Sequence, residues 1–366
     1  MAPPRKGRAR YTGVGLSALP LTVLSIGYTM APVGPDAVGG AEQILAALDR
    51  ALIDAGHRSI VVSNHGSQVA GTLVPTGPVP TRITDDERAQ ALKRHRRAIA
   101  EALAFYSVDV VHSHAVDFAD HLPEPDVPTL VTLHLPRDFY PTGAVPAKRP
   151  QTWYNCVSAS QRCSFPPFAA MLPEVKNGVP VDRLQARHAR HNFALCLGRI
   201  CPEKGFEYAL DAARLAEIPL LIGGELFPYE AHRRYFDNEI QPRLGPCARF
   251  LGPVGWARKR RLLNAAYCVL VPSLAAETSS LVAMEAIACG TPVVAFPAGA
   301  LTDIVEPGVT GYLVGDVGEM AAAIRAADAL DRERCRKVAH RRLSLERMIG
   351  SYFALYHCLA AAKRTP

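Results

Sequence analysis

The stretch Val269–Phe296, VLVPSLAAETSSLVAMEAIACGTPVVAF, contains a complete strand–helix–strand unit. Its apolar runs at 269–271 and 293–296 are typical of buried strands, and the segment 279–289 between them is typical of a helix. Strands that alternate with helices of about 10–15 residues predict βαβ units and a parallel sheet. This stretch therefore indicates an α/β fold.

The same alternation runs through the whole chain in two series. In the first series we expect strands at 21–28, 59–62, 108–112, 129–133 and 153–157, and helices at 41–55 and 85–106. In the second we expect strands at 194–197, 220–222, 250–251, 269–271 and 293–296, and helices at 203–216, 229–244, 257–266 and 279–289. Two such series predict two Rossmann-like domains with parallel sheets.

The turn signals and the chain ends suggest the domain limits. Asn-Gly and Val-Pro turns meet a polar, Arg/His-rich stretch near 178–192, where we place the join. We expect a flexible basic tail over 1–18, an N-terminal Rossmann-like domain over 19–185 and a C-terminal Rossmann-like domain over 186–345. The apolar helix over 346–366 is expected to pack back on the N-terminal domain.

Composition excludes several classes of protein. Hydrophobic residues make up 49% of the 366 residues, which is enough for two cores and argues against disorder. Nine cysteines without a CxxC pair argue against a disulfide framework or a zinc site. There is no apolar run of about 18 residues, so we expect no membrane span and a cytoplasmic protein. The net charge of +7 favours anionic partners.

Two glutamates stand eight residues apart around the start of the helix at 279–289. Glu277 lies in the loop before it, Glu285 lies within it, and Ser279 or Ser280 can cap it. A helix start offers free N–H groups and a positive dipole end, which suits a diphosphate. The spacing separates the two carboxylates, so we expect them to contact a sugar and a ribose on either side of that diphosphate.

Two further loops carry residues suited to the same ligand. In LGRICPEKG, Arg199 and Lys204 follow a strand and can clamp a diphosphate. In GPDAVGGAE, Gly39 and Gly40 allow a ligand to approach the backbone, although this is neither GxGxxG nor a Walker loop. His134 follows the strand TLVTL at the edge where ligands bind in open α/β sheets. The HxH pair His112 and His114 is interpreted as hydrogen-bonded histidines rather than metal ligands.

Together these segments resemble the retaining glycosyltransferases of family 4, which have the GT-B fold of two Rossmann-like domains facing each other across a cleft. The strongest element is the family's E-x7-E motif, here Glu277 and Glu285, continuing as EAIACGTPVVA. Four further segments support the resemblance: GRICPEKG, VSASQR, KNGVPVDRL and HLPRDFYP. The last of these is similar to a subgroup of bacterial members. One departure is TSS at 278–280, where many members carry a glycine and a small or aromatic residue.

The resemblance implies that the domain over 19–185 is the acceptor-side domain and that the domain over 186–345 binds the nucleotide sugar. It also implies a role for each site residue. Glu277 would bond the donor sugar, Glu285 the nucleotide ribose, and His134 a sugar hydroxyl. The other residues implied to bind the donor are Gly39, Gly40, Arg199, Lys204, Gly252, Val254, Ser279, Ser280 and Leu281. Arg199 and Lys204 would neutralise the departing diphosphate, so that neither a metal nor another cofactor is required.

The implied reaction moves a sugar from a UDP-, GDP- or ADP-sugar to an acceptor hydroxyl with retention of anomeric configuration. The acceptor class, glycan, lipid or small molecule, stays open. Rival interpretations are a nucleotide-sugar epimerase or hydrolase on the same fold, and a non-catalytic nucleotide-sugar binding protein. The basic stripes at 93–97 and 258–261 also suggest nucleic acid as a partner. We discount it because no RNA-binding motif accompanies the stripes. Peripheral contact with the anionic inner membrane face is the other interpretation of these stripes.

Overall fold

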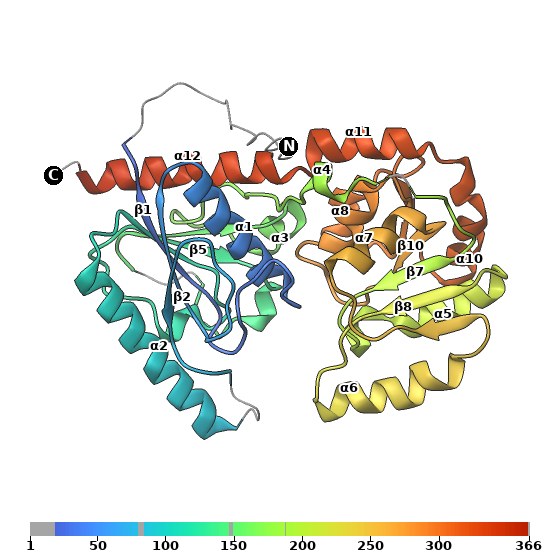
Figure 1. Ribbon diagram of the computed structural model, residues 1–366, viewed down its shortest axis with the longest axis horizontal. Coiled ribbons are helices and arrows are strands. Elements are labelled where there is room, and N and C mark those ends of the chain that lie inside the picture. Colours follow the sequence, from blue (N-terminus) through green and yellow to red (C-terminus); the bar gives the residue numbers. More distant parts are fainter. Residues whose placement is uncertain (1–18, 80–83, 146–148, 187, 365–366) are drawn as a thin grey trace, which may run out of the picture.

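The computed structural model describes residues 19–79, 84–145, 149–186 and 188–364, and the predicted tail over 1–18 lies outside them. The described chain forms two α/β halves, each built on a six-stranded parallel sheet (Figure 1). No helix among these residues is long and apolar enough to cross a membrane. The two-series pattern of the sequence thus corresponds to two separate sheets.

The first sheet has the strand order β3-β2-β1-β4-β5-β6, and all its pairings are parallel. Its strands are β1 Thr22–Ile26, β2 Arg58–Ser63, β3 Thr72–Pro75, β4 Val110–Ser113, β5 Thr129–Leu133 and β6 Thr152–Cys156. The order reverses beside β1, which places the β1–α1 and β4 ends at the switch point where open sheets bind ligands.

The second sheet has the order β12-β11-β10-β7-β8-β9 and is parallel throughout. Its strands are β7 Ala194–Leu197, β8 Leu220–Gly223, β9 Ala248–Phe250, β10 Cys268–Val271, β11 Val293–Ala295 and β12 Gly311–Leu313. Its order reverses between β7 and β10, so these two strands carry the loops with Arg199 and Glu277.

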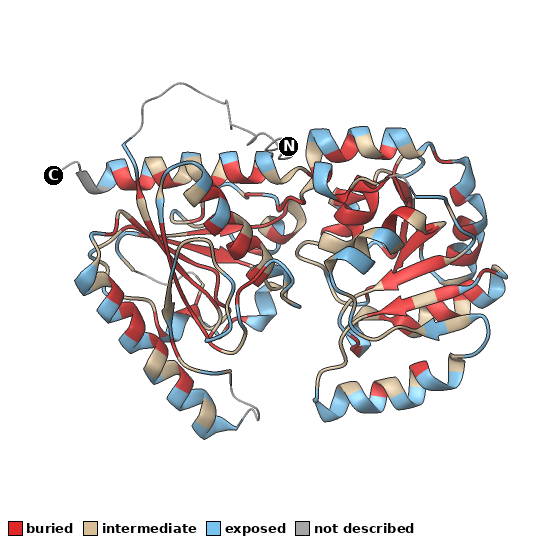
Figure 2. Cartoon of the chain, in the orientation of Figure 1, coloured by how far each residue is buried: buried red, intermediate tan, exposed pale blue. Residues whose placement is uncertain are grey.

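Helices cover the faces of both sheets. They are α1 Gly40–Asp54, α2 Asp85–Phe105, α3 Ala159–Ser164, α4 Val181–Leu184, α5 Phe206–Leu215, α6 Glu230–Tyr235, α7 Trp256–Ala265, α8 Leu281–Ala288, α9 Leu301–Ile304, α10 Val317–Ala326, α11 Arg332–Arg342 and α12 Leu345–Arg364. Short helical turns are η1 Phe118–Asp120, η2 Arg137–Phe139, η3 Pro202–Lys204, η4 Phe236–Ile240, η5 Gln241–Arg243 and η6 Ala327–Ala329. The central strands are buried, the edge strands β3 and β9 are partly exposed, and α2 and α6 each present an exposed face (Figure 2).

The final helix returns to the first half of the chain. α11 lies on the second half, and α12 continues back across the first (Figure 1). Met348, Ile349, Tyr352 and Tyr356 on α12 join one buried cluster with strand residues such as Val23 of β1. Their burial contributes about 1.5–3 kcal/mol for each large side chain, so this packing holds the helix in place.

Two predicted helices differ from the sequence expectation. The helix expected at 203–216 is split into η3 and α5 by Gly205, whose φ of 61° is left-handed. The helix expected at 229–244 is α6 followed by π-helical η4 and the short turn η5. Pro242 lies in η5, where its ring cannot continue an α-helical ladder.

Candidate active site

The predicted site residues follow the carboxyl ends of strands in both sheets. His134 follows β5, Gly39 is the N-cap of α1, and Gly40 is its first residue. Arg199 follows β7, and Glu277 lies between β10 and α8. Because every sheet pairing is parallel, the carboxyl ends of the strands in one sheet share one edge. The structure therefore places these four loop segments at the edges where open parallel sheets bind ligands.

Glu277 and Lys204 are brought together as an ion pair. Lys204 Nζ lies 2.5 Å from Glu277 Oε1, and the Ser273 hydroxyl donates to the same oxygen at 2.5 Å. The Lys204 side chain is 32% exposed and that of Glu277 11%, so the pair is only partly shielded from solvent. The Leu274 N–H donates to the Glu203 carbonyl at 2.9 Å, which fixes the Lys204 turn beside the Glu277 loop.

Glu285 has a cation of its own. Lys259 Nζ, from α7, lies 2.6 Å from Glu285 Oε1. Glu285 Oε2 is buried and has no hydrogen-bond partner within the described part of the chain. Burial raises the pKa of the Glu285 carboxyl, and the nearby Lys259 ammonium opposes that rise. The two glutamates therefore occupy separate environments, as their spacing predicts, and one carboxylate oxygen remains free to accept a ligand hydroxyl.

The start of α8 lies between the two glutamates. Ser280 caps the helix, with its hydroxyl accepting from the Ala283 N–H at 3.4 Å. Ser279 precedes it, and Leu281 is the first helical residue. The N–H groups of a first helical turn have no partner within the helix and lie at its positive end. This end of α8 can bind an anionic group.

Arg199 is placed differently from Lys204. It is exposed on the loop after β7, and its guanidinium lies over the Phe227 ring at 6.0 Å. No salt bridge to a described carboxylate is found for it. The structure thus gives Lys204 a carboxylate partner and leaves the Arg199 guanidinium at the surface, where it can bind a ligand anion.

His134 is the outer member of a chain of three histidines. Its Nε2 lies 3.0 Å from His114 Nδ1, and His114 Nε2 lies 3.1 Å from His112 Nδ1. His112 also contacts the Tyr356 hydroxyl and the Thr132 hydroxyl, each at 2.7 Å. Ring nitrogens that bond one another and two hydroxyls fit the interpretation of hydrogen-bonded histidines rather than metal ligands.

Burial keeps these imidazoles neutral. It lowers the pKa of His134 from 6.5 to about 4, and it lowers the pKa values of His112 and His114 well below 6.5. A neutral imidazole carries one N–H donor and one acceptor. His134 is therefore suited to hydrogen bonding with a hydroxyl and not to pairing with a phosphate charge.

Three contacts join the two halves beside these residues. The Thr278 hydroxyl donates to the His134 carbonyl at 2.7 Å. A Cβ on Gly40 would lie 3.3 Å from Leu281 Cδ1, so α1 and α8 begin in contact. The Ser160 N–H donates to Asp303 Oδ2 at 3.0 Å. Thr278 belongs to the TSS segment that departs from the family pattern, and its hydroxyl links the halves.

The loop with Gly252 and Val254 closes over the end of β8. The Gly224 N–H donates to the Gly252 carbonyl at 2.9 Å, and Gly252 has a left-handed φ of 69°. A Cβ on Gly223 would lie 2.6 Å from Val254 Cγ2, so this position needs glycine. The loop is next to the β7 end that leads to Arg199, since Gly198 donates to the Gly223 carbonyl at 3.1 Å.

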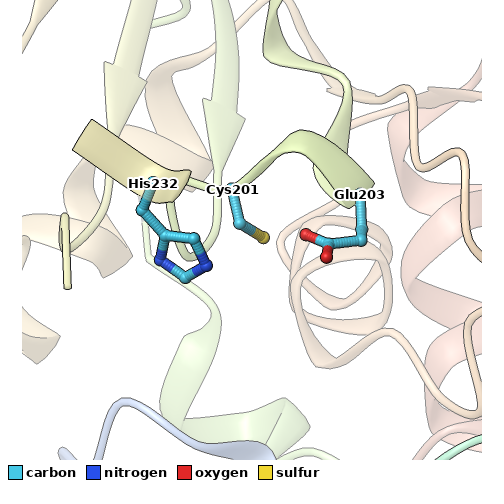
Figure 3. A group of neighbouring side chains, drawn as sticks. All are labelled: Cys201, Glu203 and His232. Carbon is cyan, nitrogen blue, oxygen red and sulfur yellow. The ribbon is translucent and has the colours of Figure 1, made fainter. Parts of the chain in front are cut away.

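Sequence reasoning missed several residues at this site. Lys259 lies in a basic stripe that we interpreted as a surface for anionic lipid, and Ser273 was given no role. The group Cys201, Glu203 and His232 was not identified, because no spacing pattern joins α6 to the loop after β7 (Figure 3). The signal that could have found Lys259 is a basic residue in the helix before the one that carries the motif carboxylate Glu285.

Comparison with protein families matches both halves of the chain. Residues 38–163 match the family "Glycosyltransferase Family 4", and residues 191–327 match "Glycosyl transferases group 1". The D-inositol 3-phosphate glycosyltransferase of Mycobacterium sp. (strain KMS) is 40% identical over 157 residues, which are 40% of this chain and 35% of the relative. The corresponding protein of Mycobacterium leprae (strain TN) is 38% identical over 157 residues, 40% of this chain and 36% of that protein. The chain thus matches about a third of the length of these relatives.

Solved structures share the fold over nearly the whole chain. AviGT4, a glycosyltransferase involved in avilamycin A biosynthesis, superposes with a TM-score of 0.70 at 24% identity, covering 93% of this chain and 98% of its own. A sucrose-phosphate synthase from Thermosynechococcus elongatus gives 0.74 at 21%, with 93% and 100% covered. The Anabaena protein HepE in complex with UDP-glucose gives 0.72 at 18%, with 92% and 100% covered.

Proposed function

We propose that this chain, which belongs to the family 4-type glycosyltransferases, transfers a sugar from a nucleoside-diphosphate sugar to an acceptor hydroxyl with retention of anomeric configuration. The observation that carries the proposal is the Glu277–Lys204 pair beside the start of α8. A carboxylate for sugar hydroxyls, a cation and a helix N-terminus for a diphosphate meet at the ends of the neighbouring strands β7 and β10. That combination suits a sugar joined to a diphosphate.

The donor would lie along the second sheet's edge, from Glu277 to Glu285. Glu277 would accept from sugar hydroxyls, and the unpartnered Oε2 of Glu285 would accept from the ribose. The N–H groups of Ser280 and Leu281 would hold the diphosphate together with Arg199 and Lys204. Gly252 and Val254 would lie near the base, while Gly39, Gly40 and His134 would approach from the first half.

Transfer needs charge stabilisation at the leaving group. The bond between sugar C1 and the phosphate oxygen breaks, and its electron pair stays on the diphosphate, which Lys204, Arg199 and the start of α8 stabilise. The acceptor oxygen attacks C1 from the face that the diphosphate leaves, and its proton passes to the departing phosphate oxygen. Neutral His134 holds a sugar hydroxyl and takes no charge during this step.

Experiment can identify the nucleobase of the donor and the acceptor directly. UDP-sugars are the leading donors, because the solved structure of the similar Anabaena protein holds UDP-glucose. The curated relatives are named for an inositol phosphate acceptor, which makes a small phosphorylated polyol a candidate beside glycans and lipids. We also propose peripheral contact with an anionic membrane through the exposed members of the stripe at 93–97.

The test is acceptor-dependent release of nucleoside diphosphate. UDP-, GDP-, ADP- and dTDP-sugars are each incubated with the full chain, with and without an extract pool of acceptors. We expect release from one donor, which increases with acceptor and disappears in Glu277→Ala and Lys204→Ala. Release that does not depend on acceptor would indicate a hydrolase, and sugar conversion without release an epimerase. No release and no binding of any donor would overturn the proposal.

A further inference from the structure

We propose that Cys201, Glu203 and His232 form a binding site for a divalent cation of the zinc class. Cys201 lies on the loop after β7, Glu203 in η3 and His232 in α6. One ligand atom from each lies within 4.8 Å of the other two. Figure 3 shows the Cys201 sulfur between the His232 ring and the Glu203 carboxylate.

The donor set selects the class of metal. A thiolate, an imidazole and a carboxylate are ligands for zinc, whereas magnesium and calcium take oxygen ligands. Metal–ligand distances of about 2.0–2.3 Å in a tetrahedral site place ligand atoms roughly 3.2–3.8 Å apart. Cys201 is buried and fixed, while Glu203 is exposed and His232 is half-buried. Side-chain rotation of the latter two can close the remaining gap.

One nitrogen of the His232 ring has no competing hydrogen bond within the described chain. Its Nδ1 is buried and has no hydrogen-bond partner among the residues that the structure describes. An imidazole with few protein hydrogen bonds can bind a metal without giving one up. The Tyr229 ring packs on the His232 ring at 5.1 Å.

The local charge is compatible with a divalent cation. A thiolate and a carboxylate neutralise the two positive charges of the metal, and the imidazole binds in its neutral form. The loaded site is therefore neutral beside the Arg199 guanidinium, which interacts electrostatically with both Glu203 and His232. The two positive charges of the metal would thus be compensated, although the site lies next to an exposed arginine.

The site would fasten one loop to one helix. Glu203 precedes Lys204 in η3, and the Glu203 carbonyl already accepts from the Leu274 N–H at 2.9 Å. A metal bound to Cys201, Glu203 and His232 would tie this turn to α6. Its role is structural, and no step of the proposed transfer passes through it, so metal binding does not depend on the transferase proposal.

Cobalt substitution tests the site directly. The full chain is freed of metal with a chelator, dialysed and titrated with Co²⁺, which reports a thiolate ligand by its charge-transfer absorption. We expect one equivalent to bind with that absorption and Zn²⁺ to displace it. Cys201→Ser should abolish the absorption, and His232→Gln should weaken binding at least about 10-fold.

Cys247→Ser is the matched control, because Cys247 is an exposed free cysteine, and it should leave the titration unchanged. If Cys201→Ser fails to fold, the Co²⁺ affinity of His232→Gln decides the question, because His232 is only half-buried. The proposal is overturned by the absence of thiolate absorption in the wild-type chain. It is equally overturned if the absorption persists in Cys201→Ser or if His232→Gln binds Co²⁺ with wild-type affinity.

Discussion

Glu285 depends on a single described cation for its charge. Its side chain is 4% exposed, and Lys259, 17% exposed, contacts it at 2.6 Å. Removing one partner of a buried ion pair leaves the other uncompensated. The Glu285 carboxylate therefore affects the stability of the folded protein as well as the proposed contact with the ribose.

Lys259→Ala should lower the free energy of unfolding by about 3 kcal/mol, because the Glu285 carboxylate would stay buried without its cation. The measurement is urea unfolding at pH 7. Arg261→Ala is the control, since Arg261 is exposed on the same helix and should change stability by less than about 0.5 kcal/mol. Equal losses in the two variants would contradict the role of the pair.

Stability should fall as the pH drops from 7 towards 4. The pKa of His134 is about 4 in the folded chain and near 6.5 when unfolded. Between pH 6.5 and pH 4 the unfolded chain binds a proton at His134 and the folded chain does not. The free energy of unfolding is therefore fully present above pH 6.5 and falls as the pH drops. His112 and His114 act in the same direction.

A raised carboxyl pKa works against this trend. Asp117 has its pKa raised to about 6 by burial, so it stabilises the folded chain on acidification. His134→Gln should reduce the loss of unfolding free energy between pH 7 and 5, measured by urea unfolding at both values. A loss in this variant as large as in the wild type would show that His134 does not titrate as described.

The residue types at the site were predictable, but their pairings were only partly so. The E-x7-E spacing placed Glu277 in a loop and Glu285 in a helix, which the structure has. The contact of Glu277 with Lys204 joins loops from two strands, and that of Glu285 with Lys259 joins two helices. Only the folded sheet brings such segments together, so the local sequence pattern could not predict which lysine lies beside each glutamate.

At the scale of elements, α12 connects the histidine chain to the end of the molecule. Tyr356 and Tyr352 are buried, and the Tyr356 hydroxyl is 2.7 Å from His112 Nδ1. The Tyr352 hydroxyl lies 3.2 Å from that of Thr132, which also contacts His112. The helix thereby supports the inner end of the chain that leads to His134.

Tyr356→Phe should destabilise the protein by about 1–2 kcal/mol, because it removes a buried hydroxyl from His112 while keeping the ring in the core. Thermal or urea unfolding measures the change. Tyr229→Phe is the control, since Tyr229 is 44% exposed, and it should have little effect. An unchanged stability in Tyr356→Phe would show that this hydrogen bond contributes nothing.

Long apolar runs made most strands predictable, including the edge strands β6 and β9, whereas the edge strands β3 and β12 were missed. β5 and β7 coincide with the predicted ranges 129–133 and 194–197. The outermost strands β3, TLVP, and β12, GYL, were not predicted. Both are short and lie at a sheet edge, where few apolar side chains are needed. The break at Gly205 in the helix expected over 203–216 was also not predicted, because the left-handed φ of Gly205 depends on tertiary contacts, such as its close approach to the Pro272 carbonyl.

At the scale of the whole molecule, the two halves meet at few polar contacts beside the proposed donor site. Thr278 on the second half donates to the His134 carbonyl on the first. Closure of such halves around a ligand is a common step in transferases that exclude water. A side chain that joins the two halves affects how easily they separate.

Thr278→Val should cost about 1 kcal/mol of unfolding free energy, since the shape is kept and the hydrogen bond is lost. Thr278→Ser keeps the hydroxyl and should retain most of the stability. Both are measured by urea unfolding under the same conditions. If serine loses as much as valine, the methyl packing of Thr278, and not its hydroxyl, joins the halves.

Turnover by Lys204→Ala tests the central claim most directly, which is that the Lys204–Glu277 corner binds the donor and stabilises its leaving diphosphate. Loss of one such electrostatic contact typically costs about 3–4 kcal/mol, so nucleoside-diphosphate release should slow by roughly 100-fold or more. Lys93→Ala, on the exposed face of α2, is the charge-matched control and should retain wild-type turnover. A Lys204→Ala variant that folds and turns over at a near-normal rate would contradict the account.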